Sequence, residues 1–455
     1  MRYLLGLVFV LGLAAGGVFL YAGRMAGPTI EIAKPEKFVG VSTPLEISVA
    51  APGARLAGLT VVLQQNGKET PLFSLTDPKG ANVRQDGADR LRVSQELGRK
   101  TVPDLKSGPA RIVVTASRKV VYDIRTVEST ATRDVQVRLE RPRVSVVSTF
   151  HFINHGGSEI VVYRVSPADV QSGVLVGDVE YPGHPASGAT VEGVRISDPA
   201  VRVAFFALLH DQDRNTPIRV FARDEAGNTG RADLDFRVFP KPFKRSRIQL
   251  DDRFLERVVT AILEGTTDVQ PEGDTLAKFL VINGELRRKN AEKIASLARQ
   301  TAPEMLWRGV VFHPFTNTAV ESAFADHRTY LYKGREVDQQ IHLGFDLASF
   351  AGTPIVSANR GKVLFADELG IYGNCVIVDH GMGVQSLYAH LSSIEVQPGQ
   401  MVDKEQQLGR SGMTGLAGGD HLHFTFLVNG RMVNPVEWWD AHWIEDRILR
   451  KLRTP

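Results

Sequence analysis

The sequence contains very little cysteine: Cys375 is the single one among 455 residues. One cysteine cannot form an intramolecular disulfide, and it excludes a zinc site built from several thiolates. It does not decide the cellular compartment, because sulfur-poor chains occur both inside and outside the cytoplasm. An excess of charge of one sign is also missing, with 54 Lys and Arg against 51 Asp and Glu. Nucleic-acid-binding proteins normally carry a basic excess or a basic stripe, so we expect no nucleic-acid partner.

Long hydrophobic runs are scarce as well, and the clearest one lies at the N-terminus. An uncharged stretch runs from Leu4 to Tyr21, between Arg2 and Arg24. Its length is close to the ~20 residues with which a helix spans a bilayer, whereas a signal peptide has a shorter apolar core. We therefore expect residues 1–27 to be an uncleaved transmembrane helix, with a cleaved signal as the alternative. The chain would then be anchored in the inner membrane, with its bulk in the periplasm.

Two segments, 28–141 and 142–245, show short apolar stretches of strand length, such as Leu59–Leu63 and Val201–Phe206. Turns rich in Gly, Pro and Asn separate these stretches, which is typical of β-sandwiches. We predict two β-sandwich-like domains. The second is expected to be immunoglobulin-like, because Asp224–Gly230 resembles the late hairpin of bacterial immunoglobulin-like domains. A spacer role is the first expectation for both, and wall or partner binding is the second.

The segment 246–301 changes to a helical pattern. Every fourth residue from Phe254 to Ile262 is apolar, after two aspartates that suit a helix cap. A second helix is expected over Glu285–Gln300, starting after the turn-forming pair Asn283–Gly284. We predict a short helical linker here.

The last part of the chain returns to a β pattern over residues 302–440, with many glycines between short apolar stretches. Residues 441–455 are expected to form a C-terminal helix and a basic tail. The predicted fold class is therefore mainly β: two sandwich-like domains, a helical linker and a C-terminal β domain, behind one transmembrane helix.

Three short blocks in this last β domain contain five residues with metal-site chemistry. Neutral imidazoles and a carboxylate suit zinc, and three protein ligands plus one open position make a catalytic zinc site. Five candidates exceed that number, so two imidazoles remain for proton transfer, which favours hydrolysis. The five residues are His342, Asp346, His390, His421 and His423.

The spacing of these residues indicates how they could converge. His421 and His423 lie two residues apart, so on a strand they share one face. One of them could then bind the metal while the other lies over the open coordination position. His342 and Asp346 lie four apart, about 13 Å on a straight strand, which is too far for one ion. The chain must bend between them, and we expect Gly344 to permit this bend.

The stretch from Pro314 to Pro435 resembles the lysostaphin/LytM-type zinc metallopeptidases, which cut peptide bonds in bacterial peptidoglycan. The resemblance covers about a quarter of the chain and follows the family block by block. The matching blocks are His342–Ala348, Gly352–Ala358, Tyr372–Asn374, Tyr388–Ser392, Gly409–Gly415, His421–Phe424 and Asn434–Pro435.

The resemblance implies a compact antiparallel β domain with an open groove, and it implies roles for the five residues. His342, Asp346 and His423 would bind one Zn²⁺ per chain. His390 and His421 would flank the open coordination position and act as catalytic residues.

Two departures from the family pattern lie near the expected groove. Asp420 stands where the family more often has proline, and Phe324–Arg328 differs from the usual Phe-Gly-x-Arg. Both leave the five site residues intact, so they bear on substrate preference.

The expected function is that of a zinc-dependent endopeptidase that hydrolyses peptide cross-links of peptidoglycan for cell-wall remodelling. The partners would be peptidoglycan and, through the N-terminal helix, the membrane. One alternative is a membrane-anchored regulatory or binding protein with an autoinhibited peptidase-like domain, which activates other wall hydrolases. Segment 251–300 or the loop 313–317 would then cover the groove, and a protein regulator would release it. A protease that acts on ordinary proteins is a third possibility.

Overall fold

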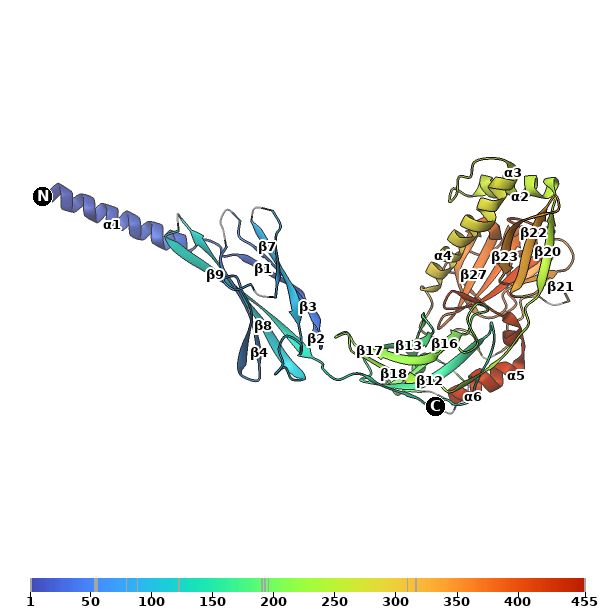
Figure 1. Cartoon of the computed structure of the whole chain (residues 1–455), viewed down its shortest axis with the longest axis horizontal. Coiled ribbons are helices and arrows are strands. Elements are labelled where there is room, and N and C mark those ends of the chain that lie inside the picture. The colour runs from blue at the N-terminus through green and yellow to red at the C-terminus, as the bar shows by residue number, and fades with distance from the viewer. Residues whose placement is uncertain are drawn as a thin grey trace. The chain divides into compact units, whose positions relative to one another are not determined.

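The protein is described from a computed structural model of the whole chain (Figure 1). Met1 of the expected transmembrane helix, Thr316 of the loop 313–317 and residues 454–455 of the expected tail lie outside the described residues, as do short stretches of the predicted β domains. The structure describes residues 2–52, 56–78, 80–87, 89–121, 123–189, 191, 194, 196–308, 310–315 and 317–453.

The chain is mainly β, with few helices, and divides into two compact units. Unit 1 comprises residues 1–142 and 223–229, and unit 2 comprises residues 143–222 and 230–455. The mainly β fold class agrees with the sequence patterns. The finer division into six segments stays a prediction.

Unit 1 begins with helix α1 (Arg2–Gly23), drawn in dark blue in Figure 1. In the part of the chain that the structure describes, no helix combines the length and the apolar character required to cross a membrane. The transmembrane helix expected over residues 1–27 stays a prediction.

The rest of unit 1 is two sheets that share one hydrophobic core. The four-stranded sheet has the order β1-β3-β7-β6 and the five-stranded sheet the order β2-β9-β8-β4-β5. Alternate residues of each sheet, such as Ile47 on β3 and Val114 on β8, are buried in the same cluster, as expected for sheets packed face to face. The strands are β1 (Thr29–Lys34), β2 (Phe38–Val39), β3 (Thr43–Ala50), β4 (Leu56–Gln65), β5 (Lys68–Ser74), β6 (Asn82–Gln85), β7 (Arg90–Leu97), β8 (Gly108–Val120) and β9 (Arg125–Val137).

Unit 2 starts with a second group of strands, which form sheets of order β10-β12-β16-β15, β14-β13-β17-β18 and β11-β19. Phe205 and Val220, from two of these sheets, are fully or almost fully buried in one core. The elements are β10 (Arg143–Val146), β11 (His151–Asn154), β12 (Ser158–Ser166), β13 (Gln171–Val176), β14 (Val179–Pro182), β15 (His184–Pro185), η1 (Ala186–Gly188), β16 (Val201–Ala207), β17 (Ile218–Arg223), β18 (Thr229–Asp233) and β19 (Phe236–Phe239).

A helical segment follows strand β20 (Arg245–Leu250): α2 (Asp252–Gly265), α3 (Thr275–Val281), the π-helical turn η2 (Ile282–Leu286) and α4 (Arg287–Ala298). The expectation of a helix that starts after Asn283–Gly284 is wrong, because the helical run begins at Thr275 and continues through this pair. The Asn283 amide donates to Asp338 at 2.7 Å, and Ile282 and Leu286 are fully buried on either side of it. Burial and this hydrogen bond outweigh the local turn preference, at the cost of a π turn.

The C-terminal β domain is built on an antiparallel sheet of order β21-β24-β32-β28-β27-β26-β30, with β33 paired to β32. Two smaller sheets, β20-β22-β23 and β25-β31-β29, flank it. The strands are β21 (Ala319–Ser322), β22 (Asp326–Tyr332), β23 (Arg335–His342), β24 (Phe345–Ala348), β25 (Pro354–Val356), β26 (Gly361–Glu368), β27 (Asn374–Gly381), β28 (Val384–Leu391), β29 (Ser393–Ile394), β30 (Met401–Val402), β31 (Gln407–Arg410), β32 (Leu422–Val428) and β33 (Arg431–Val433). The short helices are η3 (Gly370–Tyr372), η4 (Pro435–Trp439), α5 (Ala441–Trp443), η5 (Ile444–Leu449) and α6 (Arg450–Arg453).

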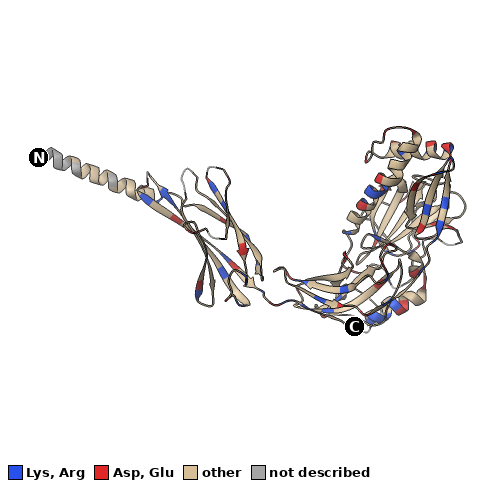
Figure 2. Cartoon of the chain, in the orientation of Figure 1, with Lys and Arg blue, Asp and Glu red and all other residues tan. Residues whose placement is uncertain are grey.

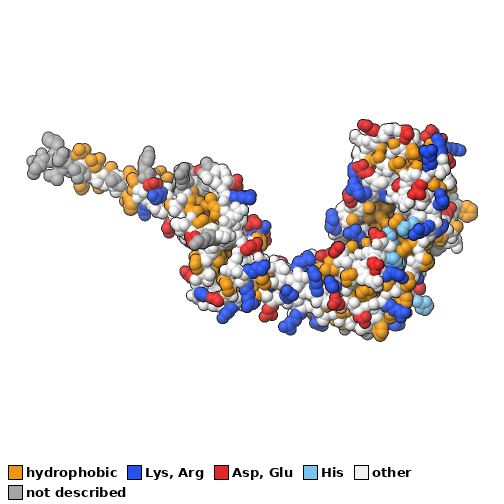
Figure 3. All heavy atoms as spheres, viewed as in Figure 1, with side chains coloured by type: hydrophobic (Ala, Val, Ile, Leu, Met, Phe, Trp, Pro, Cys, Tyr) orange, Lys and Arg blue, Asp and Glu red, His pale blue; other side chains and the backbone are white. Residues whose placement is uncertain are grey.

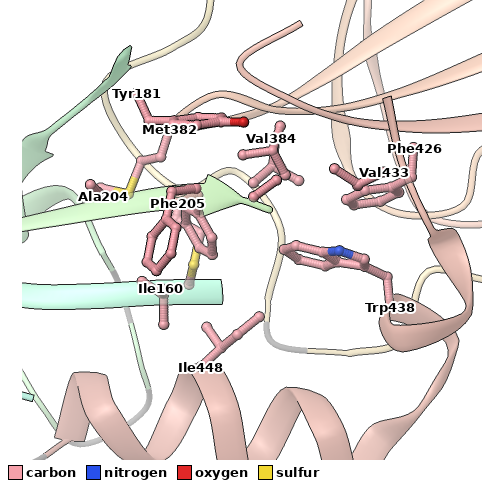
Figure 4. Close-up of a cluster of buried hydrophobic side chains, with 14 of the residues drawn as sticks. Ile160, Tyr181, Ala204, Phe205, Met382, Val384, Phe426, Val433, Trp438 and Ile448 are labelled. Atoms are coloured by element: carbon pink, nitrogen blue, oxygen red, sulfur yellow. The ribbon is translucent and has the colours of Figure 1, made fainter. Parts of the chain in front are cut away.

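One face of this sheet packs on the β strands of residues 143–239. Phe424 and Phe426 of β32 point to this face, where Trp438 stacks on Phe426 with ring centroids 4.4 Å apart. Phe205 of β16 lies 5.9 Å from the ring of Trp438. Figure 4 shows Trp438 below Phe426 and Val433, with Phe205, Ile160 and Ile448 on its other side. Both parts of unit 2 therefore share one hydrophobic core.

The opposite face of the sheet carries Leu387 and Leu427, which pack with the helical segment in a separate core. His423 points to the same face, because it lies two and four residues before Thr425 and Leu427 on β32. The helices therefore cover part of the face that carries the candidate site.

Charged residues of both signs are interspersed over the chain, as Figure 2 shows along helix α4 and the strands. On the face seen in Figure 3, hydrophobic side chains lie among these charged ones. This distribution fits the near balance of charge in the sequence.

Candidate metal centre

Three of the five candidate residues come together at the ends of three strands. Asp346 on β24 pairs directly with His423 on β32, and His342 is the last residue of β23. Oδ1 of Asp346 lies 2.9 Å from Nε2 of His342 and 3.0 Å from Nδ1 of His423, and these two nitrogens are 3.0 Å apart. One ligand atom from each residue therefore fits around a single metal ion.

Gly344 lies in the bend between His342 and Asp346, but for a different reason than expected. Its backbone is outside the left-handed region, so conformational freedom does not explain the glycine. A Cβ at this position would lie 2.6 Å from both Cε1 and Nε2 of His423. Glycine is required here because the His423 ring packs directly against the backbone.

The outer nitrogens of the two ligand imidazoles have hydrogen-bond acceptors. Nε2 of His423 lies 3.0 Å from Oγ1 of Thr425, which itself donates to the carbonyl of Leu343. Nδ1 of His342 lies 3.2 Å from the carbonyl of Ala323. These acceptors assign the ring protons to the outer nitrogens, so the nitrogens facing Asp346 carry lone pairs.

This arrangement tests whether a metal fits. Two lone pairs and a carboxylate oxygen lie about 3 Å from one another with no proton assigned between them. Such donors repel each other unless a cation lies between them. Two nitrogens and one carboxylate oxygen are a donor set that zinc accepts, with one position left open.

The other two candidates, His390 and His421, lie beside this group. Their ring centroids are 4.9 Å apart, and Nε2 of His421 is 3.5 Å from Oδ1 of Asp346. Nδ1 of His390 donates to the carbonyl of Thr414, and Nδ1 of His421 donates to that of Gly419, each at 2.8 Å. In the neutral form of each ring, Nε2 is therefore the unprotonated nitrogen and can accept a proton.

All five side chains are buried, with residue exposures of 6–8 %. Burial would raise the pKa of Asp346, but the charge of a protonated His342 and hydrogen bonds from protonated imidazoles outweigh it and hold this pKa well below its usual range when these rings carry the protons. Burial together with His421 and His423 holds the pKa of His390 well below its usual value, so this imidazole is neutral at neutral pH. Burial lowers the pKa of His423 to about 4. For His421, the hydrogen bond and charge of Asp346 outweigh the effect of burial and raise the pKa, so this ring takes up a proton at Nε2 more readily than His390 does.

Arg328 is a part of the site that sequence reasoning did not assign. Its Nη2 donates to Oδ2 of Asp346 at 2.9 Å and to Oγ of Ser322 at 2.8 Å. Both oxygens of the carboxylate therefore have a partner, Oδ1 on the metal side and Oδ2 on the arginine side. The departure of Phe324–Arg328 from the family pattern predicted that this block lies near the groove, but it did not predict the contact between Arg328 and Asp346.

Asp420, the other departure from the family pattern, anchors the chain next to His421. Its Oδ1 accepts from Oγ of Ser411 at 2.6 Å, and its Oδ2 accepts from the amide of Gly352 at 3.2 Å. An effect of Asp420 on substrate preference stays a prediction.

Residues 340–435 match the description Peptidase family M23. The peptidoglycan DD-endopeptidase ShyA of Vibrio cholerae is 29% identical over 180 residues, which are 38% of this chain and 39% of that protein. The DD-carboxypeptidase/endopeptidase Mpg of Neisseria meningitidis is 40% identical over 97 residues, 21% of this chain and 22% of that protein. The chain thus spans less than half the length of these two relatives.

A solved structure of the catalytic domain of the antimicrobial peptidase lysostaphin from Staphylococcus simulans is also similar. It is 26% identical, with a TM-score of 0.23, and the match covers 26% of this chain and 90% of that one. The family match spans all five candidate residues. Residues 340–435 therefore form a metallopeptidase domain of peptidase family M23.

Proposed function

We propose that the protein is a zinc-dependent endopeptidase that hydrolyses peptide cross-links of bacterial peptidoglycan for cell-wall remodelling. One observation carries this proposal: Nε2 of His342, Oδ1 of Asp346 and Nδ1 of His423 lie 2.9–3.0 Å from one another, with the rings of His390 and His421 beside them, within residues that match family M23. The names of the two relatives, an endopeptidase and a carboxypeptidase/endopeptidase acting on D,D bonds, support the choice of substrate.

His342 through Nε2, Asp346 through Oδ1 and His423 through Nδ1 would hold the zinc ion. Zinc, when bound, supplies Lewis acidity that acidifies water and polarises a carbonyl group. Arg328 holds the carboxylate of Asp346 from its other side and so fixes the direction in which Oδ1 points.

His390 and His421 would move the protons of the hydrolysis. Each can accept a proton from the attacking water at Nε2, because its Nδ1 proton is held by a backbone carbonyl. The Nε2–H can hydrogen-bond to the oxyanion and then give its proton to the leaving nitrogen as the C–N bond breaks, so that the proton taken from water ends on the new amino group. Burial of the two rings keeps bulk water away from this transfer.

The test is digestion of purified peptidoglycan sacculi by the intact zinc-loaded chain, followed by mass spectrometry of the released muropeptides. We expect cross-linked dimers to be converted to monomers, and a zinc chelator to stop the conversion. His423→Ala should lose both zinc and turnover, whereas His390→Ala should keep zinc and lose turnover. His442→Ala, at an exposed position, serves as the matched control.

Unchanged muropeptide profiles with the zinc-loaded chain would refute the proposal, as would turnover by a zinc-free His423→Ala protein. Cleavage of casein without any change in muropeptides would instead identify a protease of ordinary proteins. The intact chain is required, because removing the residues before 302 would expose Leu387 and Leu427, which the helical segment buries.

We propose further that residues 1–27 anchor the chain in the inner membrane and that its bulk lies in the periplasm. The uncharged run from Leu4 to Tyr21 supports this location, as does a wall polymer as substrate. Recovery of the intact protein in the membrane fraction after carbonate extraction tests the anchor. The compartment is tested with added protease, which should digest the protein in spheroplasts but not in intact cells. An autoinhibited regulator remains the alternative, and no contact among the described residues favours it over an active enzyme.

A further inference from the structure

The orientation of both proton-transferring histidines depends on one loop, residues 412–421, between β31 and β32. The carbonyl of Thr414 accepts from His390, and the carbonyl of Gly419 accepts from His421. The positions of these two carbonyls decide which nitrogen of each ring is free and where it points. This segment, the histidine loop, is therefore as important to the proposed chemistry as the rings themselves.

The amide of His421 donates to the carbonyl of Gly412 at 3.0 Å, but the two glycines between Ala417 and Asp420 do not by themselves hold the second carbonyl in place. Gly418 and Gly419 have no atom within 4 Å of a would-be Cβ, so no close packing requires glycine there. Two adjacent glycines have large conformational freedom, which must be restricted from outside. On one side, Asp420 supplies this restriction through Ser411 and Gly352.

On the other side, the restriction comes from the helical segment. Nη2 of Arg257 on α2 donates to the carbonyl of Ala417 at 2.8 Å. Ala417 is only 1 % exposed, and the amide of Leu416 donates to the carbonyl of Ile371 at 2.8 Å. Arg257 thus binds the last residue before the two glycines.

Helix α2 is a rigid support for this arginine. Asp251 caps its N-terminus by accepting from the amide of Phe254 at 2.7 Å, and Val258 and Ile262 are buried in the core shared with the sheet. The guanidinium carbon of Arg257 also lies 5.6 Å from the centroid of the Phe254 ring, within the range of a cation–π contact.

We propose that Arg257 is a positioning residue for the hydrolysis: by binding the carbonyl of Ala417 it fixes the histidine loop and, through Gly419, the orientation of His421. This inference rests on the proposed endopeptidase function. Arg257 lies outside residues 340–435, so the helical segment contributes to the site from beyond the family domain. Among the described residues, the hydrogen bond of Arg257 goes to Ala417 and not to a metal ligand, so in this proposal it acts through the loop.

The test compares Arg257→Ala and Arg257→Lys with Arg253→Ala, a control that removes an exposed arginine from the same helix. We expect Arg257→Ala to keep one zinc per chain and an unchanged KM for a cross-linked muropeptide. Its kcat should fall about 10- to 100-fold, because small displacements of catalytic groups have effects of this size. Arg257→Lys retains a donor and should recover part of the loss, and millimolar guanidinium should partly rescue Arg257→Ala. Arg253→Ala should behave as the unmodified chain.

Hydrogen–deuterium exchange gives a readout that does not depend on activity. In the zinc-loaded protein, Arg257→Ala should speed exchange of peptides that cover residues 415–421, while peptides of β28 and β24 should stay unchanged. Unchanged exchange in residues 415–421, or an unchanged kcat, would overturn the positioning role. Faster exchange in a chain that cleaves no muropeptide at all would instead leave the contact established and refute the endopeptidase function.

Discussion

Arg328 and Asp346 form an ion pair in which Nη2 lies 2.9 Å from Oδ2, while Oδ1 of the same carboxylate faces the imidazoles of His342 and His423. The arginine side chain is about one-fifth exposed, so water screens part of its charge. Its geometric effect on the carboxylate is therefore expected to exceed its repulsion of a metal ion. A donor on the outer oxygen keeps the inner oxygen directed at the site.

The first prediction concerns this ion pair. Arg328→Ala should weaken zinc binding about 10- to 100-fold, the usual effect of losing a partner of a metal ligand. Arg328→Lys should also weaken it, because the lysine side chain lacks the planar guanidinium that places Nη2 within reach of both Asp346 and Ser322. Competition with a zinc chelator measures the Kd, and Arg335→Ala, exposed on β23, is the control. Tighter zinc binding by Arg328→Ala would show that charge repulsion outweighs orientation and would contradict this argument.

The second prediction concerns the glycine beneath His423. In Gly344→Ala the new methyl group must displace the His423 ring, since a Cβ would lie 2.6 Å from two of its atoms. We expect at least a tenfold loss of zinc affinity and a stability loss of about 1–3 kcal/mol, as for other overpacked sites. Gly284→Ala is the matched control, because that position is open and helical, and it should be neutral or slightly stabilising. Zinc titration and urea unfolding measure both effects, and wild-type zinc affinity in Gly344→Ala would refute the packing argument.

The third prediction concerns pH and His380, away from the metal centre. Complete burial lowers the pKa of His380 to about 4, and both ring nitrogens have partners, the carbonyl of Arg360 and the hydroxyl of Ser386. The folded pKa lies below the unfolded value, so the stabilising effect is present above pH ~6.5 and is lost as pH falls towards 4. This difference corresponds to about 3 kcal/mol in the free energy of unfolding.

His380→Gln cannot gain this proton, so its stability should fall less than that of the unmodified chain between pH 7 and pH 4.5. Urea unfolding at a series of pH values measures the difference between the two curves. His442→Gln, at an exposed position, should follow the unmodified chain. Parallel curves for His380→Gln and the unmodified chain would show that His380 does not contribute to acid sensitivity.

The sequence predicted which side chains of β32 share a face, because the alternation of side chains along a strand depends on local geometry alone. His423 faces the site, while Leu422 and Phe424 are fully buried on the other side. The mainly β character could be predicted for the same reason, from short apolar stretches between turns. The five site residues could be grouped by their chemistry, but the division into metal ligands and proton-transferring residues came only from the resemblance to a family, since His342 and His423 are 81 positions apart.

Other features depend on contacts that no local pattern encodes. The helix that passes through Asn283–Gly284 is stabilised by an asparagine–aspartate hydrogen bond across 55 positions, which outweighs the turn preference of the pair. Arg257 contacts Ala417 across 160 positions. The bend at Gly344 was predicted at the correct position but for the wrong reason. The close packing of the His423 ring on Gly344 becomes visible only when both strands are placed.

The last prediction concerns zinc itself and the stability of the domain. In the zinc-free protein the two lone pairs and the carboxylate oxygen that face one another are unfavourable, and a bound cation removes this repulsion. Zinc at 100 times its Kd should therefore raise the free energy of unfolding by about 2.7 kcal/mol. His423→Ala should lose this gain, whereas His390→Ala should keep it, because His390 is a proton acceptor beside the metal and not one of its ligands. The gain should also shrink as pH falls below ~6, since protons compete with zinc for the imidazoles. Calorimetric unfolding with and without zinc measures each case, and an equal gain in His423→Ala would mean that the ion binds elsewhere.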